Sequence, residues 1–160
     1  MSTLQTLYGT ANQSITCTLA SLANGSARQA TAVDNSSTLF LDAFVQLKIK
    51  SGASGTSATG FVNVYAYGTA DDGTTYSDSA SGTDGAITLT SPPNVRLIGV
   101  LNVVANATTY KSAPMSVAAA FGGILPKKWG IIIENKTGGS LDATEGNHAK
   151  FYQGINIQAV

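Results

Sequence analysis

Residues 41–50 alternate strictly between two kinds of side chain. The apolar set is Leu41, Ala43, Val45, Leu47 and Ile49, and the set between them is Asp42, Phe44, Gln46, Lys48 and Lys50. Successive side chains of a β-strand point to opposite faces, so this pattern predicts a long strand with one buried face and one wet face. Such a strand belongs in a sheet that packs on one side only.

The same alternation recurs along the chain and predicts an all-β protein. Ile15, Cys17 and Leu19 share one face of an expected strand over residues 14–19. Further strands are expected over residues 29–33, 61–67, 86–90, 95–104, 110–115, 129–135 and 150–160. In the strand over 95–104, Leu97, Leu101 and Val103 are expected to share a face with Gly99, which is expected to mark a bulge. The one predicted helical segment is a turn or two over Ser116–Phe121, before Gly122.

About eight strands with unequal loops and at most one short helix favour an antiparallel β-sandwich, and the jelly roll is its natural eight-stranded form. A length of 160 residues fits a single domain over residues 1–160. An immunoglobulin-type Greek key is the alternative, but Cys17 is the only cysteine and the Cys…Trp…Cys spacing is absent. We expect Cys17 to be a reduced thiol packed in the core.

Residues 61–67 leave two interpretations open. Val62, Val64 and Ala66 form one face of the expected strand, and the opposite face carries Phe61, Asn63, Tyr65 and Tyr67. Either the aromatic face belongs to the core, or an exposed aromatic row needs a partner. Tyr65, Tyr67, Tyr76 and Trp129 would then form a sugar-stacking platform, so a glycan-binding module is the main functional alternative. The competing interpretation places Trp129 and at least one of these tyrosines in the core.

The charge content excludes several classes of function. Charged residues make up 11% of the chain, and 9 basic and 9 acidic residues give a net charge of zero. A neutral chain has no positive field to attract phosphate backbones or anionic lipid, so we expect no nucleic-acid partner. No apolar run approaches the roughly 20 residues that a membrane-spanning helix needs, so no membrane partner is expected either. Residues 1–27 hold no charged side chain, yet polar residues interrupt every apolar stretch there, and we interpret them as mature sequence.

The few candidate reactive groups favour structural roles. His148 near Asp142 and Glu145 resembles a base with its orienting group, but the chain lacks a nucleophile motif, so no enzymatic activity is expected. A calcium site would use the carboxylates of Asp71, Asp72, Asp78 and Asp84, whose spacing is more typical of solvated turns. Lys127 and Lys128 are interpreted as solvated residues at the start of a strand, and no cofactor or metal is implied. Residues 51–60 and 71–85 are expected to be the most mobile loops.

Residues 125–138, LPKKWGIIIENKTG, are followed by a polar loop and a final strand. This run resembles the C-terminal part of small structural proteins of tailed bacteriophages. The resemblance implies a virion component, often a jelly-roll decoration or cement protein on the capsid surface, made in the bacterial host cytoplasm. It implies no enzymatic activity, and it favours a trimer. Composition does not separate a capsid decoration protein from a neck, tail or fibre-base component.

These observations together predict a non-enzymatic virion protein that forms a homo-oligomer and binds the major capsid protein or another virion protein. The expected contact residues are large apolar side chains between Pro114 and Pro126, namely Met115, Val117, Phe121 and Leu125. The alternative is that this segment plugs one end of the sandwich.

Overall fold

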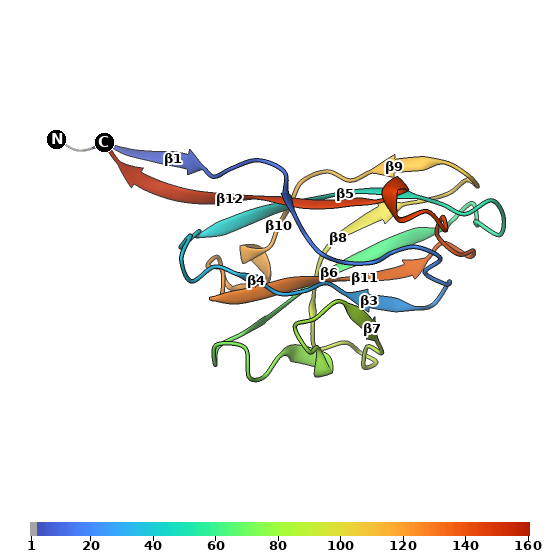
Figure 1. Cartoon of the computed structure of the whole chain (residues 1–160), viewed down its shortest axis with the longest axis horizontal. Helices are drawn as coiled ribbons and strands as arrows, with labels where there is room; N and C mark the ends of the chain where they lie inside the picture. The colour runs from blue at the N-terminus through green and yellow to red at the C-terminus, as the bar shows by residue number, and fades with distance from the viewer. Residues whose placement is uncertain (1–2) are drawn as a thin grey trace.

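The protein is a sandwich of two antiparallel sheets in a computed structural model that describes residues 3–160 (Figure 1). Sheet A contains β1 (Leu4–Tyr8), β2 (Gln13–Ser14), β5 (Asp42–Lys50), β9 (Thr109–Lys111), β10 (Met115–Ser116) and β12 (Ala149–Ala159). Sheet B contains β3 (Ala27–Gln29), β4 (Val33–Asp34), β6 (Phe61–Thr69), β7 (Gly85–Ile87), β8 (Arg96–Asn102) and β11 (Lys128–Lys136). Three short 3-10 helices complete the described elements: η1 (Ser77–Ser79), η2 (Ala118–Phe121) and η3 (Glu145–Asn147).

The strand order is that of a jelly roll. Three strands are interrupted, so that β1 and β2 lie along β12, β3 and β4 along β11, and β9 and β10 along β5. Sheet A then runs β1/β2, β12, β5, β9/β10, and sheet B runs β3/β4, β11, β6, β8, with β7 added beside β3. We count each interrupted pair (β1/β2, β3/β4 and β9/β10) as one strand and leave out β7, which gives eight strands in chain order. The first of these pairs with the eighth, the second with the seventh, the third with the sixth and the fourth with the fifth. The predicted jelly-roll sandwich is therefore confirmed.

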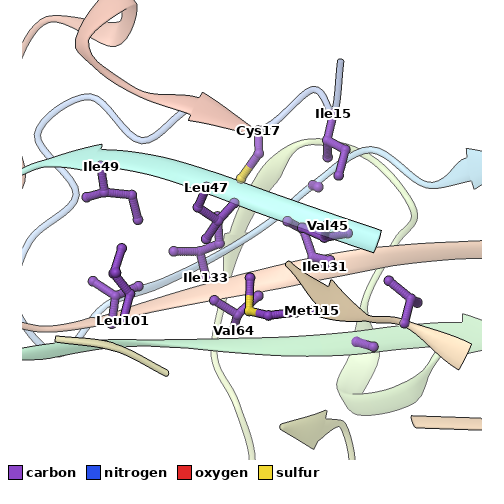
Figure 2. Close-up of a cluster of buried hydrophobic side chains, with 14 of the residues drawn as sticks. Ile15, Cys17, Val45, Leu47, Ile49, Val64, Leu101, Met115, Ile131 and Ile133 are labelled. Carbon is purple, nitrogen blue, oxygen red and sulfur yellow. The ribbon is translucent and has the colours of Figure 1, made fainter. Parts of the chain in front are cut away.

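The core fills the space between the sheets, and period-two alternation supplies its side chains (Figure 2). Val45, Leu47 and Ile49 of β5 are buried against Val64, Leu101, Ile131 and Ile133 of sheet B. Ile15, Cys17 and Leu19 are buried and the residues between them are exposed, as predicted. The strand β2 covers Gln13–Ser14, and one further ladder bond joins Ile15 N–H to Lys150 O at 2.9 Å. Beyond Ile15 the backbone stays extended, which keeps Cys17 and Leu19 on the buried face.

A second apolar cluster covers the outer face of sheet B. Val62, Val64 and Ala66 of β6 point into the main core, whereas Tyr65 and Tyr67 point outward and are buried beneath residues from 76–95. The segment between β6 and β8 therefore forms a partial third layer, seen below sheet B in Figure 1. The aromatic face of residues 61–67 therefore matches neither interpretation fully: Tyr65 and Tyr67 are buried, but on the outer side of sheet B and not between the two sheets. This layer also explains why Ile131, Ile132 and Ile133 are all fully buried.

The bulge expected near Gly99 is present, and it reverses one side chain. Val64 pairs with Gly99 but Tyr65 pairs with Leu97, so Ile98 is the extra residue in β8. Leu97 therefore points outward and is exposed, which corrects its predicted place on the face of Leu101 and Val103. A side chain at Gly99 would collide with the sulfur of Met115.

The helical turn predicted over Ser116–Phe121 is a 3-10 helix, η2. Ser116 Oγ accepts a bond from Ala119 N–H at 3.2 Å, and the turn stops at Gly122 in the left-handed region with φ of 77°. Within residues 3–160 no helix is long and apolar enough to cross a membrane.

The two loops that we expected to be most mobile make more contacts than their small residues indicate. Residues 51–60 are tied down by Ser51 Oγ, which donates to Ala105 O at 2.6 Å, and by Ser57 N–H, which donates to Thr137 O at 2.7 Å. Residues 71–85 contribute Ala80 to the outer cluster. Most residues of both loops are exposed or half-buried, and the mobility of the loops stays a prediction.

Candidate interaction surfaces

The predicted contact residues lie mostly inside the chain. Met115, Val117 and Leu125 belong to the main core cluster, with exposed fractions of 8%, 0% and 6%. Phe121 is half-buried and packs against this cluster. Side chains that are already covered by their own chain offer no area to a partner, so Met115, Val117 and Leu125 form a plug at the sandwich rather than a docking surface.

Phe121 is the member of the set that reaches the surface. It lines an open hollow of about 790 Å³ together with Leu125, Pro126 and Asp72. A Cβ added at Gly68 would lie 2.9 Å from Phe121 Cζ, so the ring rests directly on the backbone of β6. Its neighbour Ile124 is 65% exposed. Of the four predicted contact residues only Phe121 therefore stays a candidate, with the exposed Ile124 beside it.

The four aromatic residues of the proposed sugar platform do not form an exposed row. Trp129 is 1% exposed and its ring makes an edge contact with Tyr152 at 5.3 Å between centroids. Tyr67 is fully buried, donates to Ala30 O at 2.5 Å and contacts Tyr76 edge-on. Burial raises the pKa of the Tyr67 hydroxyl. Tyr65 is also buried, so the interpretation that placed Trp129 and at least one tyrosine in the interior is confirmed.

A hollow of about 570 Å³ lies between the segment around β7 and the C-terminal end of β11. Its polar groups already bind one another. Glu134 accepts from Asn63 at 2.9 Å and from the Tyr65 hydroxyl at 3.1 Å, and it pairs with Lys136 at 3.0 Å. Burial raises the pKa of Glu134, but these donors outweigh it and hold that pKa below its usual value. The carboxylate is thus held as a structural anion.

The four aspartates of residues 71–84 serve four separate structural purposes. Asp71 accepts from the Thr69 hydroxyl and from the backbone of Thr75, contacts that lower its pKa, while Asp72 faces Lys127 at 3.5 Å. Asp78 accepts from Thr90 at 2.6 Å and from Asn94 N–H at 2.8 Å, and Asp84 pairs with Arg28 at 2.6 Å. Within residues 3–160 no three potential metal ligands come together.

His148, Asp142 and Glu145 fasten a loop to the sandwich. His148 Nε2 lies 3.0 Å from the backbone oxygen of Asp142, which can only accept, so this nitrogen carries the proton. Its Nδ1 faces the backbone N–H of Lys50 at 3.4 Å. Glu145 accepts from the N–H groups of Leu19 and Ala20 and pairs with Lys150. Both imidazole nitrogens thus face backbone groups, and the ring has no free nitrogen to act as a base.

An unpartnered apolar surface lies on an arm made by β1 and residues 155–159 of β12, which extends away from the sandwich (Figure 1). Register places Leu4, Thr6, Tyr8, Ile155, Ile157 and Ala159 on one face of the arm. That face continues the outer side of sheet A, because Tyr152 and Gly154, of the opposite parity, face inward. Leu4, Tyr8 and Ile157 are 75%, 57% and 56% exposed.

Sequence reasoning missed this arm. The available signal was the absence of charge: residues 1–27 and 151–160 contain no Asp, Glu, Lys or Arg. Taken separately, each end is a short weakly alternating segment. Only the pairing of β1 with the end of β12 shows that the two uncharged segments form one surface.

A comparison of the sequence with protein-family models finds no match, and a comparison with curated proteins finds no similar sequence.

Proposed function

We propose that this protein is a non-enzymatic structural subunit of a tailed-phage virion, which sits on the capsid surface, associates with copies of itself and stabilises the shell. A ligand that binds only the assembled shell shifts the equilibrium toward assembly by mass action. Many copies make modest individual contacts sufficient.

Two features of the chain support a structural role over a catalytic one. Jelly rolls are frequent in viral capsid proteins, although lectins share the fold. The acidic residues that sequence analysis singled out, and His148, are engaged in bonds that hold loops to the sandwich.

The observation that carries the proposal is the apolar, uncharged arm. A two-stranded ribbon is marginally stable in water by itself, and an exposed apolar face adds to that cost. Leu4, Tyr8 and Ile157 are therefore best explained as contact residues in an assembly.

Chemical crosslinking of purified particles, followed by mass spectrometry, tests the proposal. We expect crosslinks from lysines on the sandwich, such as Lys111 and Lys127, to the major capsid protein. Crosslinks confined to tail, neck or fibre proteins would assign the chain to that part of the virion instead. Absence of the chain from purified particles would contradict the proposal, and specific retention on a glycan array would then favour the glycan-binding alternative.

A further inference from the structure

The outer edge of β1 is an unused row of backbone hydrogen-bonding groups. β1 is the terminal strand of sheet A, and among residues 3–160 the one strand that pairs with Leu4–Tyr8 is β12. Thr3 and Val160 exchange both of their backbone bonds, each at 2.9 Å. Bonded and non-bonded pairs alternate in an antiparallel ladder, so Gln5 and Leu7 also bond to β12. The N–H and C=O groups of Leu4, Thr6 and Tyr8 therefore point to the free edge.

This edge lacks the features that normally prevent strand addition. Sheet A ends on its other side in β9 and β10, which are three and two residues long and are accompanied by Lys111 and Pro114, residue types that discourage the addition of a further strand. Sheet B ends in the three-residue β7 and in β8, which carries Arg96 and a bulge. β1 has no charge, proline or bulge, and all five of its residues are exposed. Such an edge is a template for another strand.

We propose that β1 pairs antiparallel with β1 of a second copy of this chain, about a two-fold axis that passes midway between the Thr6 residues of the two copies. Centred there, Thr6 faces Thr6 of the second copy, and Leu4 faces its Tyr8. All three pairs use the backbone groups that point to the free edge. The two arms then form one four-stranded sheet that joins the two sandwiches, and closed two-fold symmetry is the commonest form of homo-oligomer.

The side chains of the edge fit a copy of themselves. Leu4 opposite Tyr8 is an aromatic–aliphatic pair, and Thr opposite Thr is also favourable across antiparallel strands. Directly opposed residues of paired strands point to the same face, so Leu4 and Tyr8 of both copies fall on the same side and extend one apolar face. No charged side chain lies within residues 1–27 or 151–160, so two identical β1 edges meet without repulsion between side chains and without burying an unpaired ionic side chain. An uncharged edge pairs more favourably with an identical uncharged edge than with a charged strand, which favours a second copy of this chain as the partner.

A pair of opposite charges at Thr6 tests the pairing. We expect the wild type to run at about twice 16.3 kDa in sedimentation analysis at micromolar concentration. Thr6→Lys and Thr6→Glu should each run as monomers, because like charges would meet directly at the axis. An equimolar mixture of the two variants should recover the dimer. Gln158→Lys is the matched control: it adds the same charge on β12, away from the edge, and should stay dimeric with an unchanged far-ultraviolet spectrum.

Several results would overturn the pairing: a wild-type monomer, a trimer, a Thr6→Lys dimer, or a mixture that stays monomeric. The inference rests on the self-association within the proposed function, and the two fail separately. A dimer that is missing from particles would remove the virion proposal and leave the pairing intact. A monomer that crosslinks to the shell would remove the pairing together with the self-association, and would leave only the binding to the shell.

Discussion

Cys17 illustrates how completely the core controls the chemistry of a single residue. The thiol is 3% exposed, and burial, reinforced by the charge of Asp84, raises its pKa to about 12. We expect no labelling of the native protein by a thiol reagent at pH 8, and full labelling in urea, because the thiolate is the reactive form. Rapid native labelling would contradict this.

The same shift predicts a pH effect on stability. Between about pH 9 and pH 12 the unfolded thiol ionises while the native thiol stays neutral, so the native state binds more protons and stability falls as pH rises. Cys17→Ala should lack this contribution to the pH dependence. Urea unfolding of the wild type and of Cys17→Ala across this pH range measures it as the difference between their unfolding free energies.

Asp84 shows the opposite dependence on pH. Burial raises its pKa, but bonds from Arg28 and Thr18 outweigh this and lower the pKa to about 2. The stabilisation is present above the unfolded value near 4 and is lost as pH falls toward 2. Asp84→Asn should cost about 1.5–3 kcal/mol at pH 7, the range for bonds to a charged group, and progressively less below pH 4.

Asp72→Asn is the control for this experiment. Asp72 is 60% exposed and faces Lys127 at 3.5 Å, so its loss should change the unfolding free energy by less than about 1 kcal/mol. Equal losses of unfolding free energy for Asp84→Asn and Asp72→Asn would show that the Arg28–Asp84 contact stabilises the protein no more than an exposed ion pair does.

At the scale of elements, β11 depends on a glycine opposite a tyrosine. Gly130 pairs with Tyr67 across the ladder, and a Cβ at Gly130 would lie 2.5 Å from Tyr67 Cε1. The ring is held there because its hydroxyl donates to Ala30 O. Gly130→Ala should therefore destabilise by about 1–3 kcal/mol, as overpacking does. Gly146→Ala, with nothing within 4 Å, should be near neutral in the same unfolding assay.

Local alternation predicts the face of a strand but not what lies beyond it. The buried sides of residues 15–19 and 43–49 are correctly predicted, because extended backbone alone sets them. Leu97 is wrong because an extra residue, Ile98, reverses the parity, and a bulge depends on the partner strand. Tyr65 and Tyr67 stayed ambiguous because the layer that buries them comes from residues 76–95, which the sequence shows only as loop.

At the scale of the whole molecule, the jelly roll brings the two ends of the chain together. The first and last strands pair, so β1 and β12 continue past the sandwich as one arm. The sequence predicted an assembly surface but placed it at residues 115–125, since large apolar side chains between two prolines were the visible signal. Those side chains are absorbed by the end of the sandwich, and the uncharged ends of the chain provide the exposed surface instead.

Phe121 and Ile124 distinguish these two assembly surfaces. Phe121 packs on Gly68 within its own chain, so Phe121→Ala should lower the melting temperature by several degrees, in proportion to about 1–3 kcal/mol of lost burial. Ile124 is 65% exposed, so Ile124→Ala should leave the melting temperature nearly unchanged. If the arm forms the interface, both variants keep the wild-type mass in sedimentation. A folded Ile124→Ala protein that dissociates would instead place the interface at residues 115–125, because its only altered side chain lies on that surface.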